Sequence, residues 1–190
     1  MKPDVNHRSF VREHDRMVTA REWDNPPDDG KAYDDVFKAS DCHRFGARGI
    51  TIAARNSRED ALDCVRGSDY LFEGCEIQGS ITAKGAIDGF MIRRCVVERV
   101  MEFGQFDNYW YPGRPPMKHI HIDTAWKTDN RPCHIVLWDA ETPNIESTNA
   151  LVRRVPKYIW YPYFLFRYVQ NGNRARIRGE VASQYTYLNQ

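Results

Sequence analysis

The sequence lacks a long hydrophobic run, both at its start and later. Its first residues, Met-Lys-Pro-Asp-Val-Asn-His-Arg, contain no apolar stretch of the kind found in secretion signals. No later run is long enough to cross a membrane. We therefore expect a chain made in the cytoplasm without a signal peptide and with no membrane partner. An extracellular role would need another route, such as assembly into a virion that is released by lysis.

An excess of charge of one sign is also missing. The 190 residues include 27 basic and 26 acidic side chains, which gives a formal net charge of +1. A generic binder of nucleic acids or other polyanions carries a basic excess. The balance of charge therefore predicts no nucleic-acid partner.

Several widespread catalytic motifs are absent as well. The sequence contains no nucleophile elbow, phosphate-binding loop, zinc-type cysteine pair or dinucleotide-binding fingerprint. Their absence argues against the hydrolases, nucleotide-binding enzymes and zinc proteins that carry such motifs. Any chemistry would have to come from side chains that the fold brings together.

What the sequence does contain is a near repeat between Ala61 and Val97. Residues of similar type recur 20 positions apart, namely Tyr70 and Phe90, Phe72 and Ile92, Cys75 and Cys95, and Ile77 and Val97. A period of about 20 residues indicates repeats that bury their apolar faces on their neighbours. Because Ile50 and Ile52 fall on the same grid, we expect Ile52, Phe72 and Ile92 to stack in one inward column. Cys75 should lie above or below Cys95.

Within each repeat, apolar and polar residues alternate as they do in strands. Six glycines mark corners where the chain bends: Gly49, Gly67, Gly74, Gly79, Gly85 and Gly89. Leu62 and Cys64 face inward, but their counterparts Ile81 and Ala83 come 19 residues later, which predicts a bulge. Short strands and glycine corners are typical of a parallel β-helix. The leucine and asparagine pattern of leucine-rich repeats is absent.

Residues 59–77 resemble the pectate-lyase-like superfamily, with weaker repetition over residues 49–105. The resemblance lies in an acidic-x-Ala-aliphatic-Asp segment, Glu59 to Asp63, followed by a Gly-Ser corner and a strand. It implies an all-β fold, a short single-stranded right-handed parallel β-helix or solenoid. A fold of this kind hosts many functions, so the resemblance bears on architecture more than on activity.

We divide the chain into three parts. Residues 1–34 form an N-terminal arm or cap, in which residues 9–23 could make a short helix. Residues 35–169 form the β-helix domain, with a loop at 107–116 and later strands at 118–125, 133–138, 150–154 and 157–169. Residues 170–190 form a polar C-terminal tail.

The first candidate site is an acidic cluster of Asp41, Glu59 and Asp63. One 20-residue period before Asp63 lies residue 43, beside Asp41, so carboxylates of neighbouring repeats should meet. Clustered carboxylate oxygens suit Ca²⁺. In pectate lyases the matching acidic and aspartate positions bind catalytic calcium, which the resemblance implies for Glu59 and Asp63. The alternative is an exposed acidic patch, so the expected cofactor is either none or Ca²⁺.

A lyase of this family also needs a base that removes the proton beside a uronate carboxylate. Four basic residues are available for that role: Lys84, Arg93, Arg94 and Arg99. None of them lies in the arginine-containing motif of the family, and the chain has few repeats for a polymer-binding groove. Both departures argue against lyase activity.

The second candidate site is His119-Ile-His121-Ile-Asp123. On a strand, His119, His121 and Asp123 share one face while Ile120 and Ile122 face the core. Two histidines and a carboxylate can hold a transition metal. The alternative is the solvent face of a half-buried strand, and His134 joins the site only if its strand is adjacent.

The end of the chain is rich in aromatic residues. Tyr158, Trp160, Phe164 and Phe166 fall within one segment of few charges, which is typical of the core of an interface. We therefore expect a homo-oligomer. The function that we favour is a non-enzymatic structural or attachment protein resembling bacteriophage virion components, such as a fibre, spike or capsid decoration. It would contact other particle proteins or a surface glycan.

Two alternatives to a structural role stay open. One is a calcium-dependent polysaccharide lyase. The other is a carbohydrate-binding β-helix, which the aromatic loop at residues 106–116 favours.

Overall fold

Every regular element of the protein is a strand. The computed structural model describes residues 14–23, 35–54, 60–104, 117–138 and 140–155. The strands are β1 (His14–Thr19), β2 (Phe37–Arg48), β3 (Thr51–Ala53), β4 (Asp60–Glu73), β5 (Glu76–Gln78), β6 (Ser80–Arg93), β7 (Cys95–Val97), β8 (Val100–Gly104), β9 (Lys118–Ile122), β10 (Ala125–Trp126), β11 (Cys133–Trp138), β12 (Asn144–Ile145) and β13 (Ala150–Val155). Over these residues no helix is long and apolar enough to cross a membrane. The predicted all-β class is confirmed.

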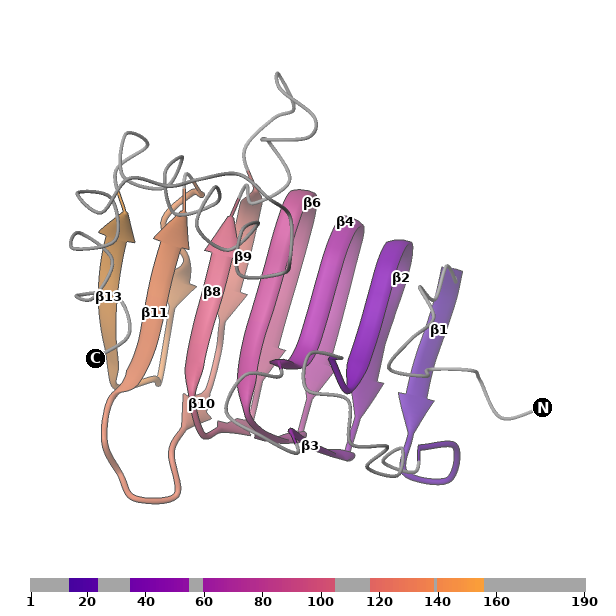
Figure 1. The fold of residues 1–190 in the computed structure, drawn as a ribbon, viewed down its shortest axis with the longest axis horizontal. Coiled ribbons are helices and arrows are strands. Elements are labelled where there is room, and N and C mark those ends of the chain that lie inside the picture. Colours follow the sequence, from indigo (N-terminus) through magenta and orange to yellow (C-terminus); the bar gives the residue numbers. More distant parts are fainter. Residues whose placement is uncertain (1–13, 24–34, 55–59, 105–116, 139, 156–190) are drawn as a thin grey trace, which may run out of the picture.

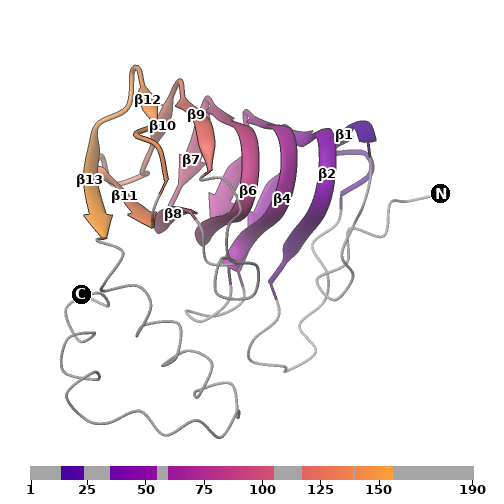
Figure 2. The same ribbon diagram turned by 90° about the horizontal axis from the view of Figure 1, so that it is seen from above.

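The strands form two parallel sheets, and the chain passes from one sheet to the other and back. The long sheet has the order β1-β2-β4-β6-β8-β11-β13, with β9 pairing both β6 and β12. The short sheet has the order β10-β7-β5-β3. Figures 1 and 2 show the long strands following one another in chain order, from β1 at one end to β13 at the other. We call a long strand together with the short strand that follows it a repeat.

The pairing of β4 with β6 confirms both the 20-residue period and the bulge. Tyr70 pairs with Phe90 and Phe72 with Ile92, whereas Leu62 pairs with Ile81, one residue out of step. The register shifts lie between Asp60 and Leu62 and between Val65 and Gly67. These shifts keep apolar residues inward on both halves of the long strands.

One predicted contact is wrong, because the preceding repeat is longer. The register of β2 on β4 is 25 residues, so Ala47 rather than Ile52 pairs with Phe72. Ile52 lies in the short sheet and pairs with Ile77. Six residues, 54–59, join β3 to β4, whereas residue 79 alone joins β5 to β6. The five additional residues account for the difference between 25 and 20.

The core between the sheets contains a stack of aromatic rings that runs through several repeats. The ring of Phe72 lies 5.8 Å from Phe37 and 5.7 Å from Phe90, measured between centroids. Phe90 continues the stack to Phe103 at 5.5 Å. All four side chains are at most 1% exposed. Packing of this kind contributes beyond the buried area alone.

Residues with left-handed backbone conformation recur at the bends of successive repeats. Gly49, Gly74 and Arg94 hold φ angles of 63°, 62° and 51° where the long strands end. Five of the six glycines predicted at corners have positive φ, and Gly79 is the exception. A Cβ atom on Gly79 would lie 2.7 Å from the Cβ of Ala54, so close packing is what requires glycine there.

The helix expected within residues 9–23 is wrong for the described part of that segment. Residues 14–19 form β1, which pairs with β2 in parallel, Met17 opposite Gly46 and Val18 opposite Ala47. Val18 is fully buried and extends the inward column of the second repeat. The edge of β2 offers backbone groups that a helix could not satisfy, and this outweighs local preference. Residues 157–190 lie outside the described part of the chain.

Candidate functional site

Four charged residues meet on the outer face of the long sheet. Asp63 lies at the centre with a fully buried side chain, and β2 brings the Nζ atom of Lys38 to 2.7 Å from its Oδ2 atom. From β6, the Nζ atom of Lys84 lies 3.0 Å from Oδ1 of Asp63. Lys38 also contacts Asp35, with 2.7 Å between Nζ and Oδ2. We call Asp35, Lys38, Asp63 and Lys84 the Asp63 cluster.

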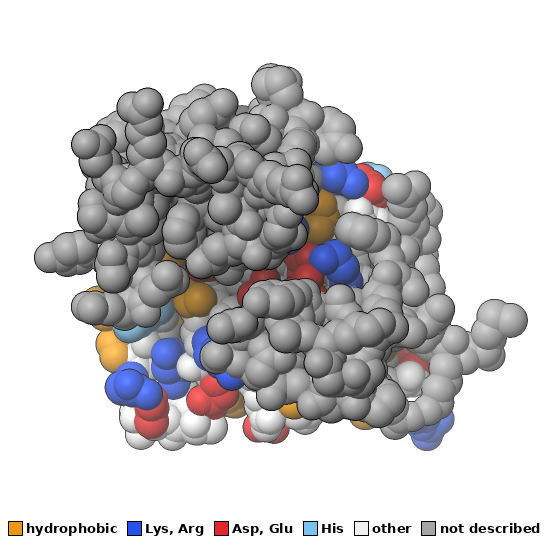
Figure 3. Space-filling model, viewed as in Figure 1, with side chains coloured by type: hydrophobic (Ala, Val, Ile, Leu, Met, Phe, Trp, Pro, Cys, Tyr) orange, Lys and Arg blue, Asp and Glu red, His pale blue; other side chains and the backbone are white. Residues whose placement is uncertain are grey.

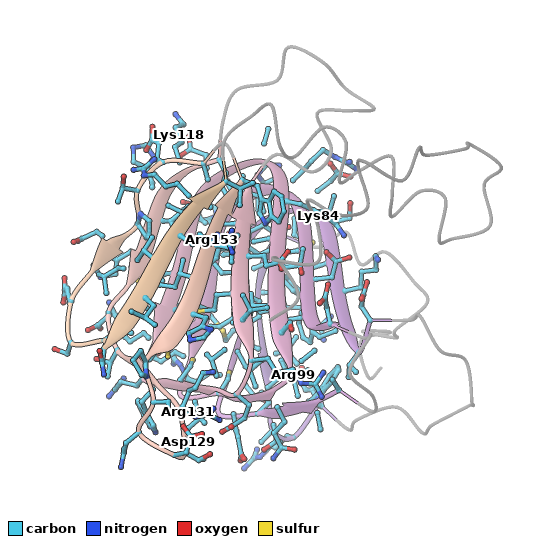
Figure 4. The ribbon with its side chains drawn as sticks, turned by 60° about the vertical axis from the view of Figure 1, so that its left-hand side comes forward. Lys84, Arg99, Lys118, Asp129, Arg131 and Arg153 are labelled. Atoms are coloured by element: carbon cyan, nitrogen blue, oxygen red, sulfur yellow. The ribbon has the colours of Figure 1, made fainter. Side chains whose placement is uncertain are left out.

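The Asp63 cluster is largely shielded from solvent. The side chains of Asp35, Lys38 and Lys84 are 15%, 20% and 24% exposed. Figure 3 shows acidic and basic side chains gathered on this face of the molecule, and Figure 4 shows Lys84 in the upper half of the long sheet, far from Asp129 and Arg131. Charges held out of water in this way interact strongly and shift each other's protonation.

The cluster separates the pKa values of its two carboxyl groups. Burial raises the pKa of Asp63, but the charges of Lys84 and Lys38 outweigh it and lower the value to about 2. Burial, followed by the negative charge of Asp63, raises the pKa of Asp35 to about 7. Burial also opposes the charge on Lys38 and Lys84, yet the carboxylates prevail and raise both lysine pKa values. A carboxyl group that exchanges its proton near pH 7, beside a fixed carboxylate, has the properties of a general acid or base.

We predict that Asp35→Asn removes a pH dependence of stability. The native pKa of Asp35 is raised above its ordinary value of 3.8, so its stabilising effect is complete below pH 3.8 and is lost as the pH rises through about 7. Asp63, with its lowered pKa, contributes constantly above pH 4. Relative to wild type, the variant should therefore gain about 2–4 kcal/mol in unfolding free energy between pH 5 and pH 8. Urea unfolding at the two pH values measures this difference.

The matched control for this prediction is Asp69→Asn. Asp69 is an exposed residue of the same strand as Asp63. Its replacement should shift the unfolding free energy equally at both pH values. A constant difference between Asp35→Asn and wild type would contradict the raised pKa.

The calcium cluster predicted from Asp41, Glu59 and Asp63 does not assemble as expected. The 25-residue register places Lys38, and not Asp41, beside Asp63, so the predicted contact between the two aspartates is wrong. Asp41 instead accepts two hydrogen bonds from Arg66, at 2.7 and 2.9 Å. Glu59 lies outside the described residues. Two ammonium groups already take the positions at Asp63 that a calcium ion would need, and the repulsion between them and Ca²⁺ disfavours the ion.

The face predicted for His119, His121 and Asp123 is confirmed, but the three side chains do not converge. Ile120 and Ile122 are 2% and 0% exposed, as their inward positions require. Each polar residue has its own partner: His119 contacts Asp88, His121 contacts Asn144 and Glu146, and Asp123 pairs with Arg93. His134 lies on β11 between β8 and β13, and not beside β9. Within the described ranges, no three His, Cys, Asp or Glu residues are grouped so that they could hold a metal ion.

The four basic residues considered for a lyase base are spread over the molecule. Lys84 belongs to the Asp63 cluster, whereas Arg93 pairs with Asp123 at 2.9 Å and Arg94 pairs with Glu73. Glu73 also binds Arg48 at 2.8 Å, so its charge links three repeats. Figure 4 shows Arg99 low in the molecule, away from Lys84.

Lys84 is thus the one member of this set that combines a shielded position with a neighbouring carboxyl group that titrates near neutral pH. Comparison with known proteins assigns no role to the cluster. No family model matches this chain, and neither a curated protein nor a solved structure is significantly similar to it.

Proposed function

We propose that the chain is a short right-handed parallel β-helix of the pectate-lyase-like kind, and that it is a non-enzymatic structural or attachment protein. Exclusively parallel pairing, the passage of the chain between two sheets and the 20-residue repeat support this architecture. Its place would be in a particle such as a bacteriophage virion, as a fibre, spike or capsid decoration. Its partners would be other particle proteins or a surface glycan.

The observation that carries this proposal is the way charged side chains pair from one repeat to the next. Arg66 binds Asp41 of the preceding repeat, and Arg93 binds Asp123 of the following one. Asp88 likewise binds Lys118, at 3.0 Å. Exposed pairs contribute little singly, but a continuous set of them fixes the register of neighbouring strands. An active site, by contrast, directs several functional groups at one point.

The end of the long sheet supports association with other subunits. Val152 of β13 pairs with Ile135 and so continues an inward column, yet it is 42% exposed. Its neighbour Leu151 is 58% exposed. The core is therefore open at β13 among the described residues. The aromatic segment with Tyr158, Trp160, Phe164 and Phe166 follows directly in the sequence, and we propose that it covers this end and contacts a neighbouring copy.

We expect the solution mass at micromolar concentration to be that of a homo-oligomer, with a trimer as the form most typical of particle fibres and spikes. Replacement of Trp160 and Phe164 together by serine should reduce the mass, because it removes apolar area from the contact. Sedimentation equilibrium measures both. The matched control is Trp126→Ser, which removes a tryptophan that is 43% exposed on the short sheet. A wild-type chain that stays monomeric at high concentration would contradict the oligomeric proposal.

One observation favours a second candidate, a polysaccharide-active enzyme. Asp35, with its pKa of about 7, lies in the same cluster as Lys84 and could move a proton during elimination from a uronate polymer. Incubation with polygalacturonate, with and without Ca²⁺, followed by ultraviolet detection of the unsaturated product, tests this candidate. Product that is lost in Lys84→Met but retained in Lys118→Met would establish the enzyme, and absence of product would leave the structural role.

A further inference from the structure

Two of the five cysteines occupy equivalent positions in successive repeats. Cys75 follows Gly74, and Cys95 follows Arg94, both of which have left-handed backbone conformation. The backbone N–H of Val96 donates to the carbonyl of Cys75 at 3.0 Å, and Glu76 pairs with Val96 in the short sheet. Cys75 and Cys95 are therefore neighbours across the pairing of two repeats, as the sequence predicts. Both are free thiols in the structure.

The spacing of the two residues is compatible with a disulfide bond. Neighbouring parallel strands lie about 4.8 Å apart, and the Cα atoms of disulfides lie about 4.4–6.8 Å apart. The Cβ atoms must approach a little for the bond to form. Gly74 gives the corner room for that change, because a Cβ atom built on it would meet nothing within 4 Å.

The surroundings of the two sulfur atoms differ in a way that suits an attacking and a resolving thiol. A hydrogen bond from the Cys95 thiol, with backbone N–H groups of Ile50 and Gly49, lowers the pKa of Cys75 to about 7. The same hydrogen bond, together with burial, raises the pKa of Cys95. The thiolate is the reactive form of cysteine, so Cys75 is the nucleophile of the pair. Burial instead raises the pKa values of Cys64 and Cys133.

Access to the pair is restricted to small oxidants. Cys75 and Cys95 are 2% and 0% exposed, but the corner residues Gly74 and Arg94 beside them are exposed. A peroxide is small enough to reach Cys75 through a modest opening of this corner, whereas a protein thiol is not. The site therefore selects both the oxidant and the partner cysteine.

We propose that Cys75 and Cys95 form a reversible disulfide that joins two neighbouring repeats when the protein meets a peroxide. The Cys75 thiolate attacks the O–O bond of hydrogen peroxide, which yields the sulfenic acid of Cys75 and, after uptake of a proton, one water. The Cys95 sulfur then attacks the sulfenic sulfur, and the hydroxyl group leaves as a second water with the Cys95 proton. In total, two thiols are oxidised to one disulfide while one peroxide is reduced to two waters. A dithiol reductant reverses the reaction.

Tryptic peptide mapping of the full chain tests the proposal. Cleavage after Arg66, Lys84, Arg94 and Arg99 places Cys75 alone on peptide 67–84 and Cys95 alone on peptide 95–99. The native protein is treated with hydrogen peroxide, unfolded, alkylated and digested. We expect peptides 67–84 and 95–99 to be joined with a loss of two hydrogens. The free thiol count should fall from five to three, because the bond consumes two of the five cysteines.

Two variants and a pH series complete the experiment. Cys75→Ser should abolish the linked peptide, and the matched control Cys64→Ser, which changes another buried cysteine, should retain it. The rate of linkage should rise as the pH increases through about 7, the pKa of Cys75. The linked protein should melt at a higher temperature than the reduced one, since the bond constrains the unfolded chain. Alkylation of both cysteines after peroxide treatment, or linkage of either to another cysteine, would overturn the proposal.

Discussion

Asp63→Asn is expected to lower the free energy of unfolding by about 3 kcal/mol at pH 7, because it removes the central carboxylate from between two lysines. Lys38 and Lys84 lie 2.7 and 3.0 Å from the two carboxylate oxygens, and the Asp63 side chain is fully buried. Asparagine keeps the shape of the side chain but not its charge. Urea unfolding monitored by tryptophan fluorescence measures the loss.

The remaining carboxyl group of the cluster should reduce this loss. The negative charge of Asp63 is the second cause, after burial, of the raised pKa of Asp35. Without that charge, Asp35 ionises more readily at pH 7 and partly neutralises Lys38. The double variant Asp63→Asn with Asp35→Asn removes this compensation, so it should lose more stability than Asp63→Asn alone, about 3–5 kcal/mol in all.

Removal of a lysine provides the matched control for the single variant. Lys84→Met in the Asp63→Asn background removes one of the two uncompensated ammonium groups and should recover part of the lost stability. The double-mutant cycle separates the charge interaction from the effect of each substitution. A loss below about 1 kcal/mol for Asp63→Asn, with no recovery in the double variant, would show that solvent reaches the cluster and screens it.

Local patterns were enough to predict much of the fold. The alternation of residues 70–72 and 90–92 predicted strands, and the 20-residue spacing predicted the pairing of β4 with β6. The one-residue slip between Leu62 and Ile81 predicted the bulge. These features depend only on short stretches of similar sequence. The inward positions of Ile120 and Ile122 were predictable for the same reason.

The Asp63 cluster was not predictable in the same way, because it depends on the length of one connection. Five additional residues between β3 and β4 change the partner of Asp63 from the vicinity of Asp41 to Lys38. A signal was nevertheless present. Residues 37–39 read apolar, lysine, apolar, and residues 62–64 read apolar, aspartate, apolar, so a 25-residue shift aligns opposite charges between matching core residues. A search over several repeat lengths would have found this alignment.

The strand β1 was missed for a different physical reason. Residues 9–23 contain sparse apolar anchors that are compatible with a helix as well as a strand, and the choice depends on the open edge of β2. That edge exists only once the repeats have formed. Tertiary pairing therefore decides the structure of this segment, and local sequence does not.

Phe72→Ala is expected to lower the free energy of unfolding by about 3–5 kcal/mol, because it empties the middle of the aromatic stack. Phe72 is fully buried and contacts the rings of Phe37, in the preceding repeat, and Phe90, in the following one. The cavity therefore lies between three repeats, and backbone pairing on both sides of β4 prevents its collapse. The matched control is Leu71→Ala, the neighbouring residue on the outer face, which is only partly buried and should lose about 1 kcal/mol. Equal losses for the two variants in urea unfolding would mean that the ring stack does not bear on the stability of the core, whereas a loss confined to Phe72→Ala supports a single core shared by the repeats.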